Sequence, residues 1–297
     1  MRCNGTMLYL IDASVYIFRA WFALPEMKSP QGAPVQAVYG LAGMLAGLLE
    51  QAAPGHIACC FDESLTTSFR NERWPDYKAG RELPPPELEA QLKDCRRLAR
   101  ALGMVELASP RYEADDLIGA LATKHREAAG GVTLVSSDKD LMQLMRPGDW
   151  FWNLAANEKF GFDDVQERLG VPPAQVAELL GLAGDPVDGI PGVRGIGRKT
   201  AAALLAHFPD LDALYEDLEA VAALPVRGAK GIARKLAEQR DIAFLSRELA
   251  TIHVDIPLAL ELEDLRWCRP DRAAVEALFD ELGFGGRLRE RILALKH

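Results

Sequence analysis

Three carboxylates lie within four residues of one another in the segment Arg111-Tyr112-Glu113-Ala114-Asp115-Asp116, directly before the apolar run 117–121. This much negative charge in one helical turn is costly unless a metal ion or another cation lies beside it. The segment therefore indicates a metal-ligand platform. The alternative is that acids in the first turn of a helix stabilise the helix dipole, which requires no ligand.

More acids follow short apolar runs that are typical of buried parallel strands. Asp12 ends the run 7–12, Asp62 ends the run 57–62, and the run 132–135 leads into Ser136-Ser137-Asp138-Lys139-Asp140. Open α/β sheets bind ligands beyond the carboxyl ends of their strands. We therefore expect these acids to converge at one edge of a sheet.

The hydrophobic pattern also predicts the elements that must position these acids. An apolar helix is expected over 35–50, an amphipathic helix over 87–102, a strand over 104–107, the acid-headed helix over 113–128 and a short hairpin over 150–162. The later helices are expected over 172–182, 200–207, 211–224, 231–249 and 271–282. An α/β part is thus followed by a helical part.

Basic and aromatic residues interleave between Phe69 and Arg81, without helical or strand periodicity, before the block Pro84-Pro85-Pro86. Such a segment can follow a single-stranded nucleic acid backbone and stack on its bases. The alternative is an ordinary solvated loop.

A glycine-rich stretch, 184–201, precedes the helix expected from residue 200 and contains Arg194, Gly195, Gly197, Arg198, Lys199 and Thr200. Glycines free the backbone in a tight turn, so N–H groups before a helix can face a phosphate while the cations supply charge. We expect a hairpin that binds the DNA backbone without sequence specificity. A weaker version recurs over 227–235 and includes Lys230.

The chain has 297 residues, of which 49% are hydrophobic, and a net charge of −9. The candidate site contains nine carboxylates, so the remainder carries no net charge and the acidity does not exclude a nucleic-acid partner. The five cysteines form no CxxC pair, and no apolar run resembles a signal or a membrane span, so we expect a cytoplasmic protein without zinc.

Several motifs resemble the 5′-nuclease (flap endonuclease) superfamily, and above all the N-terminal 5′→3′ exonuclease domain of bacterial DNA polymerase I. They are segments 77–81, 111–116, 136–140, 184–192 and 195–201. The resemblance implies a PIN-like, mainly parallel α/β core over 7–170, with a helical arch at about 70–100. It also implies an all-α DNA-binding domain over 171–297, with a helix-hairpin-helix at about 184–207.

The resemblance also implies roles for individual residues. Asp12, Asp62, Glu113 and Asp115 would surround one divalent ion (Mg²⁺ or Mn²⁺), and Asp138, Asp140 and Asp188 a second, with Asp116 and Asp185 in or near the outer shell. Lys78 and Arg81 would meet the scissile phosphate and Tyr77 would stack near it. Arg19 and Arg70 would line the entrance, and K⁺ would bind at the hairpin.

Two positions depart from the family pattern: Gly189 replaces an asparagine, and Ala13 replaces a glycine. The expected protein is a monomer that cleaves DNA with 5′ flaps or 5′ ends, and RNA-DNA hybrids, during replication and repair, with a functional link to a DNA polymerase. It is either a free-standing exonuclease or a segment of a longer chain. The alternatives are a PIN-type ribonuclease, which would not need the basic hairpin, and a structure-specific DNA-binding protein without catalysis.

Overall fold

The structure is a computed structural model that describes residues 7–63 and 66–295, so Cys3 and His297 lie outside the described residues. A six-stranded sheet has the order β3-β2-β1-β4-β5-β6, and its neighbours are parallel except for the antiparallel pair β5 and β6. The strands are β1 (Leu8–Asp12), β2 (His56–Asp62), β3 (Val105–Ser109), β4 (Val132–Val135), β5 (Trp150–Asn153) and β6 (Glu158–Gly161). The predicted mainly parallel α/β core is confirmed.

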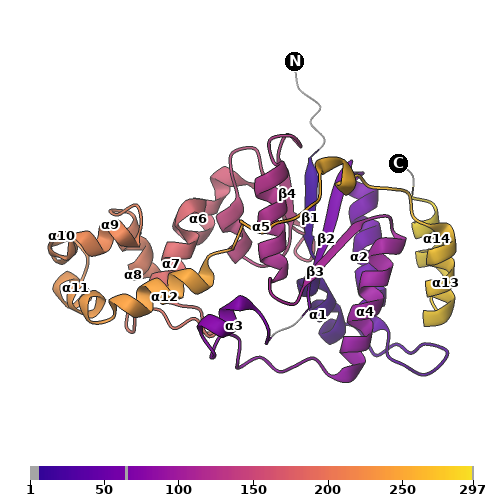
Figure 1. The fold of residues 1–297 in the computed structure, drawn as a ribbon, viewed down its shortest axis with the longest axis horizontal. Helices are drawn as coiled ribbons and strands as arrows, with labels where there is room; N and C mark the ends of the chain where they lie inside the picture. The colour runs from indigo at the N-terminus through magenta and orange to yellow at the C-terminus, as the bar shows by residue number, and fades with distance from the viewer. Residues whose placement is uncertain (1–6, 64–65, 296–297) are drawn as a thin grey trace, which may run out of the picture.

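Helices cover both faces of this sheet (Figure 1). One face packs under α1 (Ala13–Ala23), α2 (Gln36–Ala52) and α4 (Pro86–Ala101), and the other under α5 (Ala114–His125). The adjacent Cys59 and Cys60 of β2 lie in the two opposite cores, as side-chain alternation along a strand requires. Because both faces are buried, the central strands are continuously apolar until they reach their terminal acids.

A second unit is built from helices alone and has its own hydrophobic core. Its elements, after α6 (Val165–Leu169), are α7 (Val176–Ala183), α8 (Arg198–Leu205), α9 (Leu211–Glu216), α10 (Leu218–Ala223), α11 (Ala229–Glu238) and α12 (Arg240–Ala250). Two of the expected helices are each split in two. Asp217 separates α9 from α10 by capping the Ala220 N–H, and Gln239 separates α11 from α12 and bonds the Arg194 N–H.

The last part of the chain does not belong to the helical unit, in contrast to the expectation that 171–297 forms one domain. After α12 it returns along the sheet, where Trp267 is buried and its indole N–H donates to the Leu102 carbonyl oxygen. Helices α13 (Arg272–Leu282) and α14 (Gly286–Leu293) then pack outside α4 and α2, at the opposite end of the molecule from α9–α11 (Figure 1). The sequence does not indicate where α13 and α14 pack, because their apolar residues would suit either unit.

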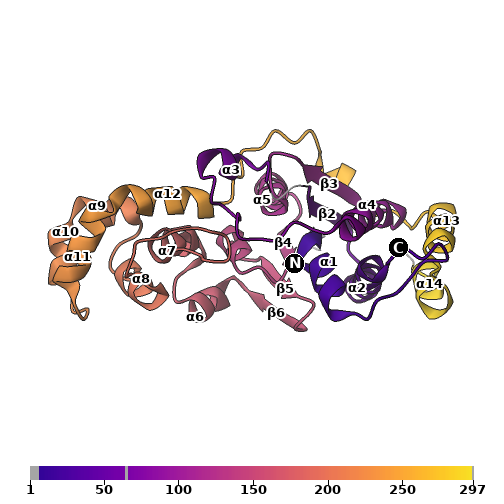
Figure 2. The ribbon, with the colours of Figure 1, turned by 90° about the horizontal axis from the view of Figure 1, so that it is seen from below.

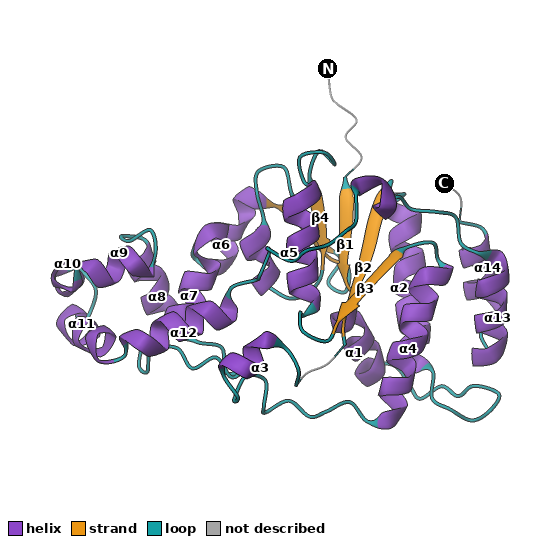
Figure 3. Ribbon diagram, in the orientation of Figure 1, coloured by secondary structure: helices purple, strands orange, loops and turns teal. Residues whose placement is uncertain are grey.

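Residues 69–85, which we call the crossing segment, run between the two units below the carboxyl ends of the strands (Figures 1 and 2). Only α3 (Phe69–Arg73) is helical, and the rest is irregular (Figure 3). The expected helical arch over 70–100 is therefore shorter and mostly non-helical, because α4 packs into the core through Leu88, Cys95 and Leu98. Among the described residues, none of the helices has the length and apolar character needed to span a membrane.

Candidate active site

The acids predicted at the strand ends converge where β1 and β4 lie side by side. The Ser136 hydroxyl donates to Asp12 Oδ2 at 2.8 Å and accepts from the Asp138 N–H at 2.9 Å, so it links the acids that follow β1 and β4. Asp62 Oδ1 accepts from the Ala114 N–H, the first of α5, at 2.8 Å. Parallel strands thus deliver one acid each to a common crevice.

Burial and mutual repulsion act together on these carboxylates. Burial, followed by the charge of Asp62, raises the pKa of Asp12 from 3.8 to about 7. Burial also raises the pKa of Asp115 well above its usual range, with Asp138 and Asp12 adding to the shift. Such shifts mean that the protein scaffold alone does not supply enough positive charge to keep all of these carboxylates ionised.

A second group of acids joins the cluster from the helical unit. The loop after α7 is closed by paired backbone bonds between Asp185 and Ile190, at 2.9 and 2.8 Å, and it carries Asp188. Burial raises the pKa of Asp140 to about 7, and Asp138, Asp185 and Asp188 add to that rise. Acids from both units therefore face one site, and a cavity of about 20 Å³ lies among them.

Two cations of the crossing segment reach into this cluster. Lys78 Nζ lies 3.0 Å from Glu113 Oε1 and 4.0 Å from Asp188 Oδ2, and its side chain is only 9% exposed. Arg81 pairs with Asp188. Burial alone would lower the pKa of Lys78, but Glu113 and the other nearby acids raise it, so the ammonium stays charged. Lys78 thus lies between an acid of the sheet unit, Glu113, and an acid of the helical unit, Asp188, and Arg81 pairs with the latter.

The crossing segment docks against the loop that carries Asp188. The Lys78 N–H donates to the Asp188 carbonyl oxygen at 2.8 Å, and the Trp74 indole donates to that of Gly189 at 3.2 Å. Gly189 has φ +68°, and a Cβ there would overlap the carbonyl oxygen of Asp76. Glycine at this position therefore permits the close approach, which explains the departure from the family's asparagine. Lys78 itself has φ +54°, a conformation that is uncommon outside glycine.

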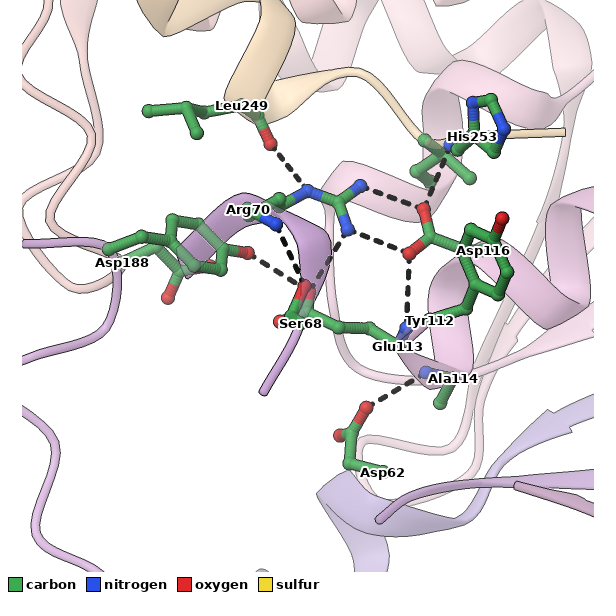
Figure 4. A network of polar contacts seen from close by, with 12 residues as sticks. Asp62, Ser68, Arg70, Tyr112, Glu113, Ala114, Asp116, Asp188, Leu249 and His253 are labelled. Carbon is green, nitrogen blue, oxygen red and sulfur yellow. Dashed lines mark hydrogen bonds and ion pairs between the residues drawn. The ribbon is translucent and has the colours of Figure 1, made fainter. Parts of the chain in front are cut away.

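The start of α5 is fixed by a buried ion pair (Figure 4). Glu113 and Asp116 form a capping box, in which Asp116 Oδ2 accepts from the Glu113 N–H at 3.0 Å. Arg70 donates to both Asp116 oxygens at 2.7 Å, and the Tyr77 hydroxyl bonds Glu113 Oε2 at 3.0 Å. The carboxylate of Glu113 is thus held in place by α3 and by the rest of the crossing segment.

The glycine-rich hairpin buries its apolar residues and exposes its cations. Val193 and Ile196 are buried in the helical core, whereas Arg194, Arg198 and Lys199 are exposed. Gly197 caps α8, and Gly195 has φ +86° and lies against Lys235 of α11. The second basic turn precedes α11, with Gly228 at φ +81° and Lys230 exposed. In both turns, exposed cations lie next to the first residues of a helix.

Among the described residues, no three Asp, Glu, His or Cys side chains are arranged to hold a metal ion as they stand. Bonds to Ser136, the Ala114 N–H, Tyr77 and the two cations engage oxygens of four of these acids, Asp12, Asp62, Glu113 and Asp188. The donor set is nevertheless purely carboxylate, which suits hard divalent ions such as Mg²⁺ or Mn²⁺, and its excess charge calls for them. The chemistry of the donor set therefore fits such ions.

Comparison with known proteins places this site in a family. Residues 7–170 match the model of the 5′-3′ exonuclease N-terminal resolvase-like domain, and residues 171–273 match its C-terminal SAM fold. The chain belongs to the 5′-3′ exonuclease family. It is 41% identical over 278 residues to DNA polymerase I of Pseudomonas aeruginosa and 37% identical over 285 residues to that of Bacillus subtilis. It covers 30% and 31% of the lengths of these two relatives, and 93% of this chain is matched in each.

Solved structures share the fold of this 5′-3′ exonuclease family member at low sequence identity. The T5 5′-exonuclease with bound zinc superposes with a TM-score of 0.67 at 17% identity, covering 97% of this chain and 98% of that one. The catalytic core of Rad2 in complex with a DNA substrate gives 0.64 at 17% identity, covering 99% and 93%. These likenesses establish the fold.

The structure corrects the predicted position of Arg70 and gives the surroundings of Asp116 and Arg19. Arg70 was expected to line the entrance, but it is 3% exposed and paired with Asp116, so it cannot contact DNA. Asp116 is fully buried, and its oxygens bond Arg70, the Glu113 N–H and the His253 N–H, so it lies behind Glu113, and its outer-shell role stays a prediction. Arg19 is exposed on α1, beside a separate cavity of about 410 Å³ between α1 and α2.

Sequence reasoning missed two serines that orient the acids. Ser136 bonds Asp12 and Asp138, and Ser14 accepts from the Asp62 N–H at 2.9 Å. Ser136 lies inside the acidic motif 136–140, so its position next to a strand-end acid was an available signal. Ser14 also lies two residues from a strand-end acid, Asp12, but it bonds Asp62, 48 residues away, and this pairing has no signal in the sequence.

The raised pKa values predict how the ion-free protein responds to pH. The folded state binds protons on Asp12 and Asp140 that the unfolded state has already released, so the free energy of unfolding should fall as the pH rises from about 4 to about 7. Asp12→Asn should flatten this fall and raise the stability of the ion-free protein at pH 8, by on the order of 1 to 4 kcal/mol. Urea denaturation in EDTA measures the effect. Glu89→Gln, at an exposed acid of α4, is the control and should leave the pH profile unchanged.

Proposed function

We propose that this protein is a divalent-metal-dependent 5′→3′ exonuclease and 5′-flap endonuclease that hydrolyses phosphodiester bonds in DNA. The observation that carries the proposal is the convergence of acids from the sheet and from the helical unit beneath the cations of the crossing segment. The similarity to the 5′-3′ exonuclease family, to DNA polymerases I and to the T5 5′-exonuclease supports the same activity. RNA primers and 5′ flaps formed during replication and repair are the proposed substrates.

The residues of the site would have different roles in hydrolysis. Asp12, Asp62, Glu113 and Asp115 would hold one Mg²⁺ or Mn²⁺ ion and Asp138, Asp140 and Asp188 another, with Asp185 close by. Such ions would supply the charge that activates the attacking water and stabilises the leaving oxygen. Lys78 and Arg81 would turn from their acid partners toward the scissile phosphate, where negative charge builds up. Tyr77 was expected to stack near the phosphate, but it is buried in the helical core and bonded to Glu113, so it would instead help to orient that carboxylate.

The helical unit would bind the duplex through its backbone. Exposed Arg194, Arg198 and Lys199 flank the start of α8, and Lys230 lies at the start of α11. The N–H groups of Gly195, Gly197 and Thr200 would face phosphates or a K⁺-bridged backbone at the same turn. Contacts of this kind position a substrate without reading its sequence. We further propose that the protein acts as a monomer and cooperates with a DNA polymerase.

A labelled 5′-flapped duplex tests the proposal directly. Cleavage in Mg²⁺ and none in EDTA is expected, with products released from the 5′ side. Binding without cleavage under any metal condition would instead favour a binding protein without catalysis. Exclusive cleavage of RNA would favour a PIN-type ribonuclease.

Lys78 should act on the transition state more than on binding, because it is the cation held most closely among the acids. Lys78→Ala should lower the single-turnover rate at saturating DNA by roughly 10²-fold, the loss typical of one charge-stabilising donor. Lys93→Ala, at an exposed lysine of α4, is the matched control and should keep the wild-type rate. If Lys78→Ala instead keeps the wild-type rate at saturating DNA and only binds DNA more weakly, Lys78 contributes to substrate binding and not to the transition state.

The hairpin cations should contribute to affinity in a salt-dependent manner. Arg194→Ala and Lys199→Ala should each weaken duplex binding equally on all sequences and reduce the slope of log K against log salt by roughly 1. Binding is measured in Ca²⁺ by fluorescence anisotropy at several salt concentrations. Arg266→Ala, at an exposed arginine of the α/β part, serves as the control. Weaker binding with an unchanged slope would show that the hairpin cations do not contact phosphates.

A further inference from the structure

The Arg70 guanidinium lies at the boundary between the two units and bonds both of them (Figure 4). Its terminal nitrogens bond Asp116 of α5, whereas Nε donates to the Leu249 carbonyl oxygen at 2.8 Å and Nη2 to that of Thr251 at 2.9 Å. The same group lies 3.5 Å from Glu113 Oε2. One side chain, 3% exposed, therefore connects the acid-headed helix to the end of α12.

The bonds to Leu249 and Thr251 close the C-terminal end of α12. The last carbonyls of a helix have no partner within the helix, and they carry partial negative charge that a buried cation offsets. Beyond this point the chain leaves the helical unit, and the His253 N–H bonds Asp116 Oδ1 at 2.8 Å. Arg70 and Asp116 therefore fix both the end of α12 and the start of the chain that follows it, which returns along the sheet.

Helix α12 in turn holds the loop that carries Asp188. The Ser246 hydroxyl, fully buried, accepts from the Gly192 N–H at 2.9 Å, at the end of that loop. Gly181 of α7 lies so close to α12 that a Cβ on it would be 2.9 Å from the Arg247 Cβ. A shift of α12 would therefore move α7 and the loop, and Asp188 with them.

On the other side of Arg70, its partner Asp116 fixes the acids of the sheet unit. Asp116 bonds the Glu113 N–H in the capping box, and Arg70 faces the carboxylate of Glu113 itself. The single ion pair thus sets where Glu113 lies in one unit and, through α12, where Asp188 lies in the other. Lysine could not replace the guanidinium, because its one ammonium lacks the planar fork that reaches two oxygens and two carbonyls together.

We propose that Arg70 is a positioning residue that sets the spacing between Glu113 and Asp188, and thereby the affinity of the site for divalent cations. The inference rests on the proposed function, since it assumes that both acids help to bind metal. It assigns Arg70 no contact with substrate. Loss of a partner that orients a metal ligand typically weakens metal affinity by about 10- to 100-fold.

Mn²⁺ binding without DNA, measured by calorimetry, tests the proposal. Arg70→Lys should weaken Mn²⁺ binding by about 10-fold or more. The double variant Arg70→Met/Asp116→Asn should do the same, and because it removes both charges of the buried pair it leaves no buried charge unpaired. The control is Arg73→Ala: Arg73 also lies on α3 and pairs with Glu248 of α12, but this pair is exposed, so Mn²⁺ affinity should stay at the wild-type value.

A second variant tests the route through α12 without touching the ion pair. Ser246→Ala removes the bond to the loop and should weaken Mn²⁺ binding several-fold. In the flap assay, the Arg70 variants should need a higher Mg²⁺ concentration for half-maximal rate and should recover most of the rate at saturating Mg²⁺. A role confined to stability would lower the midpoint of thermal unfolding and leave this Mg²⁺ requirement unchanged.

The outcomes separate this inference from the proposed function. Wild-type Mn²⁺ affinity in either Arg70 variant or in Ser246→Ala, in a protein that folds as judged by cooperative thermal unfolding, would overturn the positioning role while leaving the nuclease proposal intact. If the wild-type protein itself neither binds Mn²⁺ nor cleaves a flap, the proposed function fails first. Weakened Mn²⁺ binding in the Arg70 variants beside an unchanged Arg73→Ala protein is the expected result.

Discussion

The repulsion between carboxylates gathered at the ends of parallel strands is the constraint on which the rest of this structure depends. Burial of Asp12 and Asp115 makes each charge expensive, and proximity makes the next one more so. Because these carboxylates lie beside one another, the site is built to be completed by positive charge from elsewhere.

The protein supplies part of that charge from a segment that belongs to neither unit. Lys78 and Arg81 reach the acids from an irregular stretch, and Tyr77 anchors that stretch in the core of the helical unit. The backbone of Lys78 is in the left-handed region, which costs on the order of 1 kcal/mol and persists because its surroundings hold it there. The tertiary contacts of the segment therefore hold its cations beside the acids.

Buried polar contacts give the assembly its specificity. The pair Arg70 and Asp116 contributes little net stability compared with an apolar replacement, because desolvation offsets most of the Coulomb attraction. Its geometry, however, admits only one relative placement of α5 and α12. A site whose acids come from two units needs such a constraint more than it needs stability.

The local sequence determined the strands, their terminal acids and the glycine-rich hairpin. These features repeat over a few residues, so burial periodicity and turn chemistry reveal them without any knowledge of distant contacts. Only the tertiary structure decided that Arg70 is buried against Asp116, that Arg19 lies beside another cavity and that α13 packs on the sheet unit. Each of these features depends on partners that are far apart in the chain. The packing of those partners decides whether a side chain faces solvent or is buried, and this packing leaves no local pattern in the sequence.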